Sequence, residues 1–585
     1  MSGTPIRSGG NHPLGDHSVD SRMPLLAVMA TVVGAGGALG AWALVKLIAV
    51  ATNLFWFTRL SADTVSITDA SVGLMVIAIP VIGSLIVGLM ARFGSDKIRG
   101  HGIPEAIETI LYGESRLPLK VAILKPLSSA VSIGSGGPFG AEGPIIMTGG
   151  AIGSLFAQCF HLSAAERKTL LVAGAAAGMT AIFGTPLAAI LLAVEVLLFE
   201  WKPRSFVPVV VAAIISCYCR PYLLGAGPMF AMSATLPGTS WDLFASAALG
   251  IVMGIEAMLL STSLYRVEDL FHRLPLHWMW WPAIGAIAVG LGGLVDARVL
   301  GAGYASIEAL LNGSLALKLV VSLLVIKALV WLIALGSGTS GGVLAPLLIL
   351  GGTAGFLLGQ FLPGDPSFWA MIGMAGIMSG AMRAPLTGAL FAVELTGNFE
   401  AIPCTVAAAA GAYAVSVLFM RRSILTEKIA RRGRHVLQEY TVDPLDLLQA
   451  GQIMTHAPET LPASMTAAQA VTFFAEEARH RSYPVVDADN RLVGIVSRAD
   501  ALHWQAATGM KDATLGETIS DADLPAAFPE ASAGAVADLI IETGIGRIPI
   551  VDRNSRKVLG LLTRQDLLKA RSASRMAEVG RSRFV

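Results

Sequence analysis

Charged residues are scarce in this sequence. Of its 585 residues, 14% are Asp, Glu, Lys or Arg and 54% are hydrophobic, whereas soluble domains carry about 25% charged residues. The composition therefore predicts that most of the chain lies in a lipid bilayer. The formal net charge of +1 lacks the positive excess of a nucleic-acid-binding protein, so no nucleic-acid partner is expected.

Cysteine is also rare, and its four copies all lie in apolar segments. Cys217 and Cys219 form a Cys-x-Cys pair with no second ligand pair, so neither a metal site nor a disulfide framework is expected. The glycine-rich stretches lack the Gly-Lys-Ser/Thr ending of a phosphate-binding loop, and no catalytic constellation is present. We therefore do not expect an enzyme.

Two apolar runs of membrane length open the chain. Residues 23–57 and 72–90 can each cross a bilayer, for which about 20 residues suffice, and the polar residues 1–22 form a predicted cytoplasmic tail. From residue 100 to about residue 219 the apolar runs are short and interrupted by Gly and Pro. Such broken helices place backbone ends inside the membrane, where only protein or a water-filled path can satisfy them. We expect a multi-pass α-helical membrane domain over residues 23–432.

The membrane region contains an internal repeat. Three blocks recur in the same order at nearly constant separation: GSGGPFGAEGPIIMTGGAIG (134–153) with GSGTSGGVLAPLLILGGTAG (336–355), TPLAAILLAVEV (185–196) with APLTGALFAVEL (384–395), and GHGIPEAIETILYG (100–113) with GAGYASIEALLNG (301–313). The repeat halves span about residues 23–223 and 240–432. A repeat of broken helices is typical of transporter folds whose site lies at the interface of inverted repeats.

Glu142 stands in the glycine-rich turn of the first block, directly before an apolar helix with Pro144 in its first turn. The unpaired N–H groups and the dipole of a helix N-terminus attract anions, and glycines let an ion approach the backbone. A tethered carboxylate can occupy such a site and then yield it to a free ion. Alternatively, Glu142 only caps the helix. An ionisable residue amid membrane-grade apolar sequence favours the functional interpretation.

The end of the membrane region carries the basic cluster RRSILTEKIARRGRH (421–435), which predicts a cytoplasmic location. A linker (433–449) leads to two similar soluble units at 450–508 and 512–575 and a tail at 576–585. Each unit is predicted to contain a β-hairpin followed by a capped helix. The capping pairs are Ser497 with Asp500 and Thr563 with Asp566.

Several of these motifs together resemble the ClC family of chloride channels and proton-coupled chloride antiporters. GHGIP (100–104) resembles the family's GSGIP, GAEGP (140–144) its GREGP or GKEGP, GGVLAP (341–346) its GGIFAP, and SILTEKIARRG (423–433) its last membrane helix. The soluble tail resembles a paired CBS module. The resemblance implies the ClC fold followed by a cytoplasmic α/β tandem CBS module, in a homodimer.

The resemblance also assigns roles to individual residues. Glu142 matches the glutamate that blocks the outer anion site and relays protons, and Lys120 matches a lysine that adds positive field near the pathway. The implied anion-binding positions are His101, Gly102, Ile103, Gly140, Ala141, Gly143, Val343, Leu344 and Leu425. In the tail, Ser497, Asp500, Thr563 and Asp566 match positions that hold adenine nucleotides in some CBS modules; these helices could equally serve only dimerisation.

The sequence departs from the family pattern at four positions. His101 replaces the serine of the central anion site, Leu425 replaces its tyrosine, and Ala141 replaces the arginine before the gating glutamate. Val196 stands where antiporters carry a second, inner glutamate. His101 is either an anion donor, even one that titrates near neutral pH, or a helix cap. Glu195 and Glu394, like Lys125 and Lys327, pair across the repeat, and a shared structural role is favoured for them.

The sequence thus predicts transport of chloride or a similar small anion, as a voltage-gated-type channel or as a proton-coupled antiporter. Replacement of the central serine leaves fluoride and nitrate open. A CBS-regulated magnesium transporter is a remote alternative, because it would need carboxylates along the membrane path. The expected location is the inner or plasma membrane of a bacterial-type cell, with the N-terminus and the CBS module in the cytoplasm. No cofactor is required, although an adenine nucleotide could bind the module.

Overall fold

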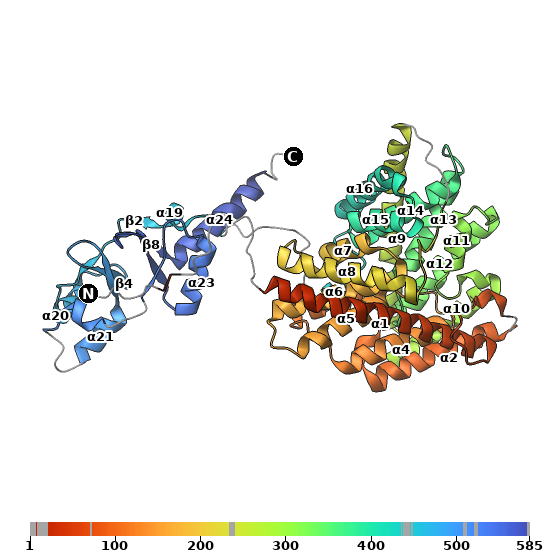
Figure 1. Cartoon of the computed structure of the whole chain (residues 1–585), viewed down its shortest axis with the longest axis horizontal. Helices are drawn as coiled ribbons and strands as arrows, with labels where there is room; N and C mark the ends of the chain where they lie inside the picture. Colours follow the sequence, from red (N-terminus) through yellow and green to blue (C-terminus); the bar gives the residue numbers. More distant parts are fainter. Residues whose placement is uncertain are drawn as a thin grey trace. The chain divides into compact units, whose positions relative to one another are not determined.

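The chain forms two compact units in a computed structural model. The structure describes residues 7–8, 22–70, 73–232, 240–434, 436, 445, 448–506, 512–519 and 524–581. One unit comprises Val19–Glu439, and the other combines Tyr440–Val585 with Met1–Ser18 (Figure 1).

The larger unit is helical, and its two halves contain the same series of helices. The first half holds α1 (Met23–Phe57), α2 (Met75–Leu89), α3 (Ile103–Tyr112), α4 (Leu119–Gly134), α5 (Glu142–Gln158), α6 (Ala164–Phe183), α7 (Pro186–Leu192) and α8 (Pro203–Leu223). The second half holds α9 (Ser240–His272), α10 (Trp281–Val295), α11 (Tyr304–Leu311), α12 (Leu317–Gly336), α13 (Leu344–Gly359), α14 (Pro366–Met382), α15 (Pro385–Thr396) and α16 (Ile402–Phe419), followed by α17 (Glu427–Arg431).

Among the described residues, seven helices are long and apolar enough to cross a membrane. Others are much shorter: α3 and α7 in the first half, and α11 in the second, do not reach the roughly 20 residues of an upright span. The predicted multi-pass fold with broken helices is confirmed.

The packing of the helices repeats between the halves. Helix α5 packs against α6 as α13 packs against α14, and α1 packs against α8 as α9 packs against α16 (Figure 1). Each pair rests on close glycine contacts. A Cβ on Gly149 would collide with the Gly174 carbonyl on α6, and one on Gly351 would stand 2.6 Å from the Gly373 carbonyl on α14. The repeat predicted from three sequence blocks therefore extends over eight helices in each half.

Two glutamates connect the halves at the starts of α7 and α15. The Glu195 carboxylate accepts from the N–H groups of Leu386 (3.3 Å) and Thr387 (2.9 Å) at the start of α15. The Glu394 carboxylate accepts from Leu187 (3.0 Å) and Ala188 (2.8 Å) at the start of α7. Each half thus caps a helix of the other, which is the structural role that the sequence favoured for this pair.

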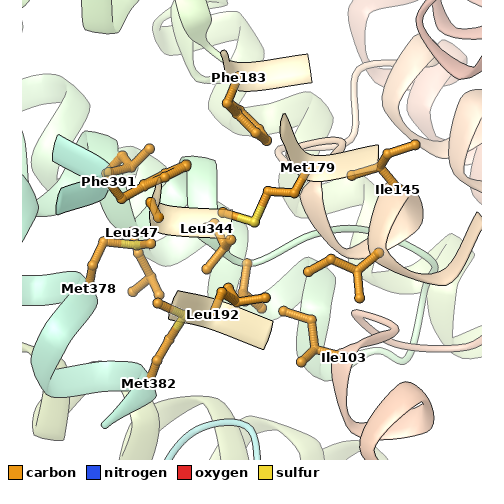
Figure 2. Close-up of a cluster of buried hydrophobic side chains, with 14 of the residues drawn as sticks. Ile103, Ile145, Met179, Phe183, Leu192, Leu344, Leu347, Met378, Met382 and Phe391 are labelled. Carbon is orange, nitrogen blue, oxygen red and sulfur yellow. The ribbon is translucent and has the colours of Figure 1, made fainter. Parts of the chain in front are cut away.

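Apolar side chains from both halves converge at the centre of this unit. Figure 2 shows Ile103 of α3, Met179 and Phe183 of α6, and Leu344 of α13 among them. All four are fully buried. The core therefore surrounds the starts of α3 and α13, where the broken helices meet.

The smaller unit contains two βα halves. Its elements are β1 (Arg7–Ser8), α19 (Ala450–Ile453), β2 (Thr455–His456), β3 (Leu461–Pro462), α20 (Ala467–Glu476), β4 (Ser482–Val486), β5 (Leu492–Ser497), α21 (Arg498–Ala506), α22 (Leu515–Thr518), β6 (Pro525–Ala526), α23 (Ala533–Thr543), β7 (Arg547–Val551), β8 (Val558–Thr563) and α24 (Arg564–Arg581). One sheet has the order β3-β4-β5 and another β2-β8-β7, while β1 pairs with β6.

Both predicted hairpins of this unit are present. Strands β4 and β5 pair antiparallel, as do β7 and β8. The two hairpins also contact each other, because Leu492 N–H donates to the Arg556 carbonyl (3.1 Å) and Val558 N–H to that of Asn490 (3.0 Å). Helices α21 and α24 follow the hairpins, so the predicted α/β class of the tail is confirmed.

Candidate functional site

Three glycine-rich loops, two of them from the first half, meet at the candidate site. Gly100 N–H donates to the Thr339 carbonyl (2.9 Å), and Gly342 N–H donates to that of Gly140 (3.1 Å). These bonds join the loops that precede α3, α5 and α13. The positive N-terminal ends of three helices consequently point into one buried region, which is the arrangement that attracts an anion.

The Glu142 carboxylate lies in the cradle that these loops form. The side chain is fully buried. A Cβ on Gly140 would collide with this carboxylate, and one on Gly342 would stand 2.7 Å from its Oε2. The carboxylate also faces the N–H of Ala345 in the first turn of α13, while Oε2 makes no hydrogen bond of good geometry to the described residues. Glycine is required at both positions because the carboxylate occupies the space of a side chain.

His101 lies next to this cradle with an unpaired ring nitrogen. The residue is 3% exposed, and its Nδ1 has no hydrogen-bond partner in the described parts of the chain. Its carbonyl packs against Gly143, where a Cβ would collide with it. No side-chain hydrogen bond caps the start of α3, where Gly102 is the N-cap residue with φ +87°. The helix-cap alternative for His101 is therefore wrong, and a buried imidazole nitrogen remains available to a ligand.

The other predicted anion-binding residues line this region with backbone and apolar groups. Ile103, Val343 and Leu344 are fully buried, Ala141 is 4% exposed, and Leu425 belongs to the same buried cluster. Next to Leu425, Ile424 N–H donates to the Ala381 carbonyl (3.1 Å), and its own carbonyl accepts from Tyr265 Oη. The structure thus brings the predicted positions into one core. Neither His101 nor Leu425 provides a side-chain hydroxyl there.

The lysine at this site is Lys125, and the prediction of Lys120 is not supported by its position. Lys120 lies in the first turn of α4 and is exposed. The Lys125 ammonium is buried and donates to the carbonyls of Ile98 and Gly100 (2.8 Å each) and to Ser340 Oγ (3.1 Å). Five residues turn a helix by about 140°, so the two lysines face nearly opposite directions.

Lys327 is the counterpart of Lys125 in the second half. Its ammonium donates to the carbonyls of Val299 and Gly301, each at 2.8 Å. Both lysines therefore fasten the loop before a short broken helix to the middle of a long one. The shared structural role that the sequence favoured is present in both halves, and Lys125 alone of the two also contacts a serine hydroxyl among the described contacts.

Tyr304 is a site residue that sequence reasoning missed. Its hydroxyl donates to Glu142 Oε1 (3.3 Å) and accepts from the N–H of Ala141 (3.3 Å). Tyr304 begins α11 and matches Ile103, the first residue of α3, in the repeat alignment. That alignment was the available signal, because it pairs Tyr304 with a predicted anion-binding position.

A cavity of about 750 Å³ opens beside Tyr304 and Ala141. Its wall includes Arg220 and Arg298, and the described residues that line it contain no carboxylate. The Arg220 guanidinium donates to the carbonyls of Ala181, Gly225 and Gly227, and none of its described hydrogen-bond partners is an acid. Positive charge in a cavity with apolar walls attracts anions toward Glu142.

A second missed feature connects α3 to the last helix. Glu105, one turn after His101, is 5% exposed and forms ion pairs with Lys428 (2.8 Å) and Arg432 (3.2 Å). Lys428 belongs to α17, which leads toward the tail. The basic cluster at residues 421–435 is thus bound by ion pairs to α3, the helix that begins at the candidate site.

In the tail, the predicted capping pairs are formed. Asp500 Oδ2 accepts from Ser497 N–H (2.7 Å) and Oγ (2.6 Å), and Asp566 Oδ2 accepts from Thr563 N–H (3.0 Å) and Oγ1 (2.6 Å). These bonds confirm the helix caps. Nucleotide binding by the same residues stays a prediction.

Comparison with known proteins agrees with this geometry. The family model described as voltage gated chloride channel matches residues 82–417, and that of the CBS domain matches residues 450–507 and 517–573. The chain is 29% identical over 390 residues to the voltage-gated ClC-type chloride channel ClcB of Salmonella typhimurium, covering 64% of this chain and 92% of the relative. It is also 29% identical over 362 residues to the H(+)/Cl(-) exchange transporter ClcA of Yersinia pestis, covering 59% and 74%.

Solved structures show the same fold. A slow cyanobacterial Cl-/H+ antiporter superposes with a TM-score of 0.62 at 22% identity, covering 71% of this chain and 99% of the other. A eukaryotic CLC transporter gives a TM-score of 0.59 at 20% identity and covers 93% of this chain and 99% of the other. The chain is therefore a multi-pass membrane protein that belongs to the voltage-gated chloride channel (ClC) family and carries a pair of CBS domains.

Proposed function

We propose that this protein conducts chloride or a similar small anion across a membrane, with Glu142 as the gate. The observation that carries the proposal is the position of the Glu142 carboxylate. It fills a cradle at the meeting point of three glycine-rich loops, where Gly140 and Gly342 lie against it, next to a cavity with two arginines and no acid among its described lining residues. An anion that displaces the carboxylate inherits the same N–H groups.

Passive conduction is the form of transport that the site supports best. Val196, at the position of the inner glutamate of antiporters, is fully buried. A proton leaving Glu142 toward that side would meet apolar side chains, unless water supplies the path. Without an inner acid, movement of the gate admits anions and carries few protons.

Proton-coupled antiport is the second candidate, and the presence of Glu142 itself favours it. A buried carboxylate that alternates between blocking the site and leaving it can take up a proton in each cycle. The two mechanisms make opposite predictions for proton flux, so one assay separates them.

The test is chloride efflux from liposomes that hold the purified protein, with the internal pH followed at the same time. Fast efflux without proton movement supports the channel. Proton entry that tracks chloride exit, and that disappears in Glu142→Ala, supports the antiporter. If no halide or nitrate moves in wild-type protein of verified fold, the proposed function is wrong.

The central site of this protein is proposed to use His101 in place of a hydroxyl. The imidazole Nδ1 is buried and has no partner among the described residues, and the nearby Lys125 ammonium adds positive charge. We expect His101→Ala to weaken anion binding, measured by calorimetry on purified protein. Flux with fluoride or nitrate but not with chloride would assign a different selectivity to this site.

The assembly, orientation and regulation of the protein are further proposals. A homodimer is proposed from the resemblance to the ClC family, and single-molecule photobleaching counts the subunits. The basic residues around α17 support a cytoplasmic tail, which protease accessibility in oriented vesicles tests. Adenine nucleotide binding by the CBS pair predicts that ATP, ADP or AMP raises the melting temperature of the full-length protein.

A further inference from the structure

Tyr304 provides the contact on which this inference rests. Its hydroxyl lies 3.3 Å from Glu142 Oε1, and Tyr304 is the one side chain that donates to Glu142 among the described hydrogen bonds. The two residues come from opposite halves of the repeat. The residue that blocks the anion site in one half is therefore held by a residue of the other.

The hydroxyl is oriented for this purpose. The N–H of Ala141 donates to the Tyr304 oxygen (3.3 Å), and this bond occupies a lone pair of the oxygen. The hydroxyl hydrogen is left to point at the carboxylate, because a phenol both accepts and donates. A hydrogen bond to an ionised acceptor is stronger than one between neutral groups.

Aromatic neighbours fix the ring. Phe183 meets it edge-on with centroids 6.4 Å apart, and Phe230 lies against it at 6.1 Å. Phe183 in turn packs edge-on against Phe391 of α15 (5.3 Å), and both are seen in the central cluster (Figure 2). The ring therefore keeps the hydroxyl in place when the carboxylate moves.

Tyr304 also lies on the wall of the cavity described above. Tyr304 and Ala141 both line the 750 Å³ cavity that contains Arg220 and Arg298, while Glu142 on the other side of the hydroxyl is fully buried. Tyr304 therefore borders the cavity and contacts the carboxylate at the same time. Ala141 has only a methyl side chain, so the Tyr304 hydroxyl is the polar side-chain group that this pair of residues offers.

We propose that Tyr304 is a latch that holds Glu142 in its blocking position and thereby sets how readily anions displace it. It acts through Glu142 and is a positioning residue. The inference rests on the proposed role of Glu142 as the gate. Tyr304→Phe removes the latch and keeps the ring contacts, so the carboxylate leaves the cradle more often.

The test compares Tyr304→Phe in two backgrounds, wild type and Glu142→Ala, by chloride efflux from liposomes at limiting chloride concentration. A hydrogen bond to a charged group corresponds to roughly a 10-fold change in the open fraction, so efflux should rise about 10-fold in the wild-type background. It should stay unchanged in the Glu142→Ala background, where nothing remains to be held. Tyr413→Phe, on the exposed side of α16, is the matched control and should leave efflux unchanged in both.

Equal changes in both backgrounds would overturn the latch, because they would mean that Tyr304 shapes the pathway and not the gate. Unchanged efflux in the wild-type background would overturn it too. Activity of the double variant verifies that Tyr304→Phe folds. Wild-type chloride efflux tests the proposed function separately, so failure of the latch and failure of that function are distinguishable.

Discussion

Removing the reciprocal caps should destabilise the membrane unit without changing proton coupling. Glu394 is 7% exposed and accepts two backbone N–H groups at the start of α7. In Glu394→Ala both N–H groups lose a charged partner. Hydrogen bonds to charged groups contribute roughly 1.5–3 kcal/mol each, and loss of a helix cap costs about 0.5–2 kcal/mol. We therefore expect the free energy of unfolding to fall by about 3 kcal/mol.

The melting temperature gives the readout. Because its shift per kcal/mol falls with size, about 1 °C per kcal/mol applies to a unit as large as Val19–Glu439, and Glu394→Ala should melt about 3 °C lower in detergent. Glu394→Gln keeps an acceptor oxygen and should recover part of the loss. Glu308→Ala, at an exposed position of α11 without a described partner, is the matched control and should change the melting temperature by less than about 1 °C.

The opposite pattern would refute the structural role. If Glu195→Ala and Glu394→Ala kept the wild-type melting temperature but changed the ratio of protons to chloride in the liposome assay, these carboxylates would carry protons. A double variant adds a further check. Since each glutamate caps a helix of the other half, the two losses act on one interface and should not be additive.

Three other perturbations follow from the geometry. Gly342→Ala places a Cβ 2.7 Å from Glu142 Oε2 and 2.5 Å from the Gly140 carbonyl. If this contact destabilises the blocking position of Glu142 by about 1.4 kcal/mol or more, anion efflux changes at least about 10-fold. Efflux at the wild-type rate would contradict the cradle. Lys125→Met and Lys327→Met should both lower the melting temperature, because each removes a buried ammonium that donates to two backbone carbonyls. Only Lys125→Met should weaken chloride binding in calorimetry, and equal effects on binding would show that Lys125 is not part of the site. In the tail, hydrogen bonds from the N–H and Oγ of Ser555 lower the pKa of Asp552. The stability that this carboxylate contributes is present above its unfolded pKa of about 3.9 and is lost as the pH falls through the folded value; circular dichroism of Asp552→Asn should therefore show a weaker loss of stability on acidification, and an unchanged acid transition would contradict this.

The fold and much of the candidate site could be predicted from the sequence because they depend on local patterns. Low charge and broken apolar runs indicate broken membrane helices, and the glycine spacing around Gly140 recurs around Gly342. A carboxylate can enter the backbone cradle only where no Cβ stands, so the glycines themselves mark the place. The caps at Ser497 and Thr563 are equally local, since each joins residues three positions apart.

The tertiary structure decided the contacts between distant residues. Tyr304 reaches Glu142 only because the two halves pack with the starts of α11 and α5 together. The choice between Lys120 and Lys125 depends on which side of α4 faces the loops. This helix buries polar residues such as Ser128 and Ser132 and exposes apolar ones such as Ile123, so the usual rule that the apolar face is buried does not identify the inward side. The exchange of caps between Glu195 and Glu394 likewise depends on the packing of one half against the other. Local physics thus determines which groups are available to an anion, and only the packing of the halves determines which of them meet.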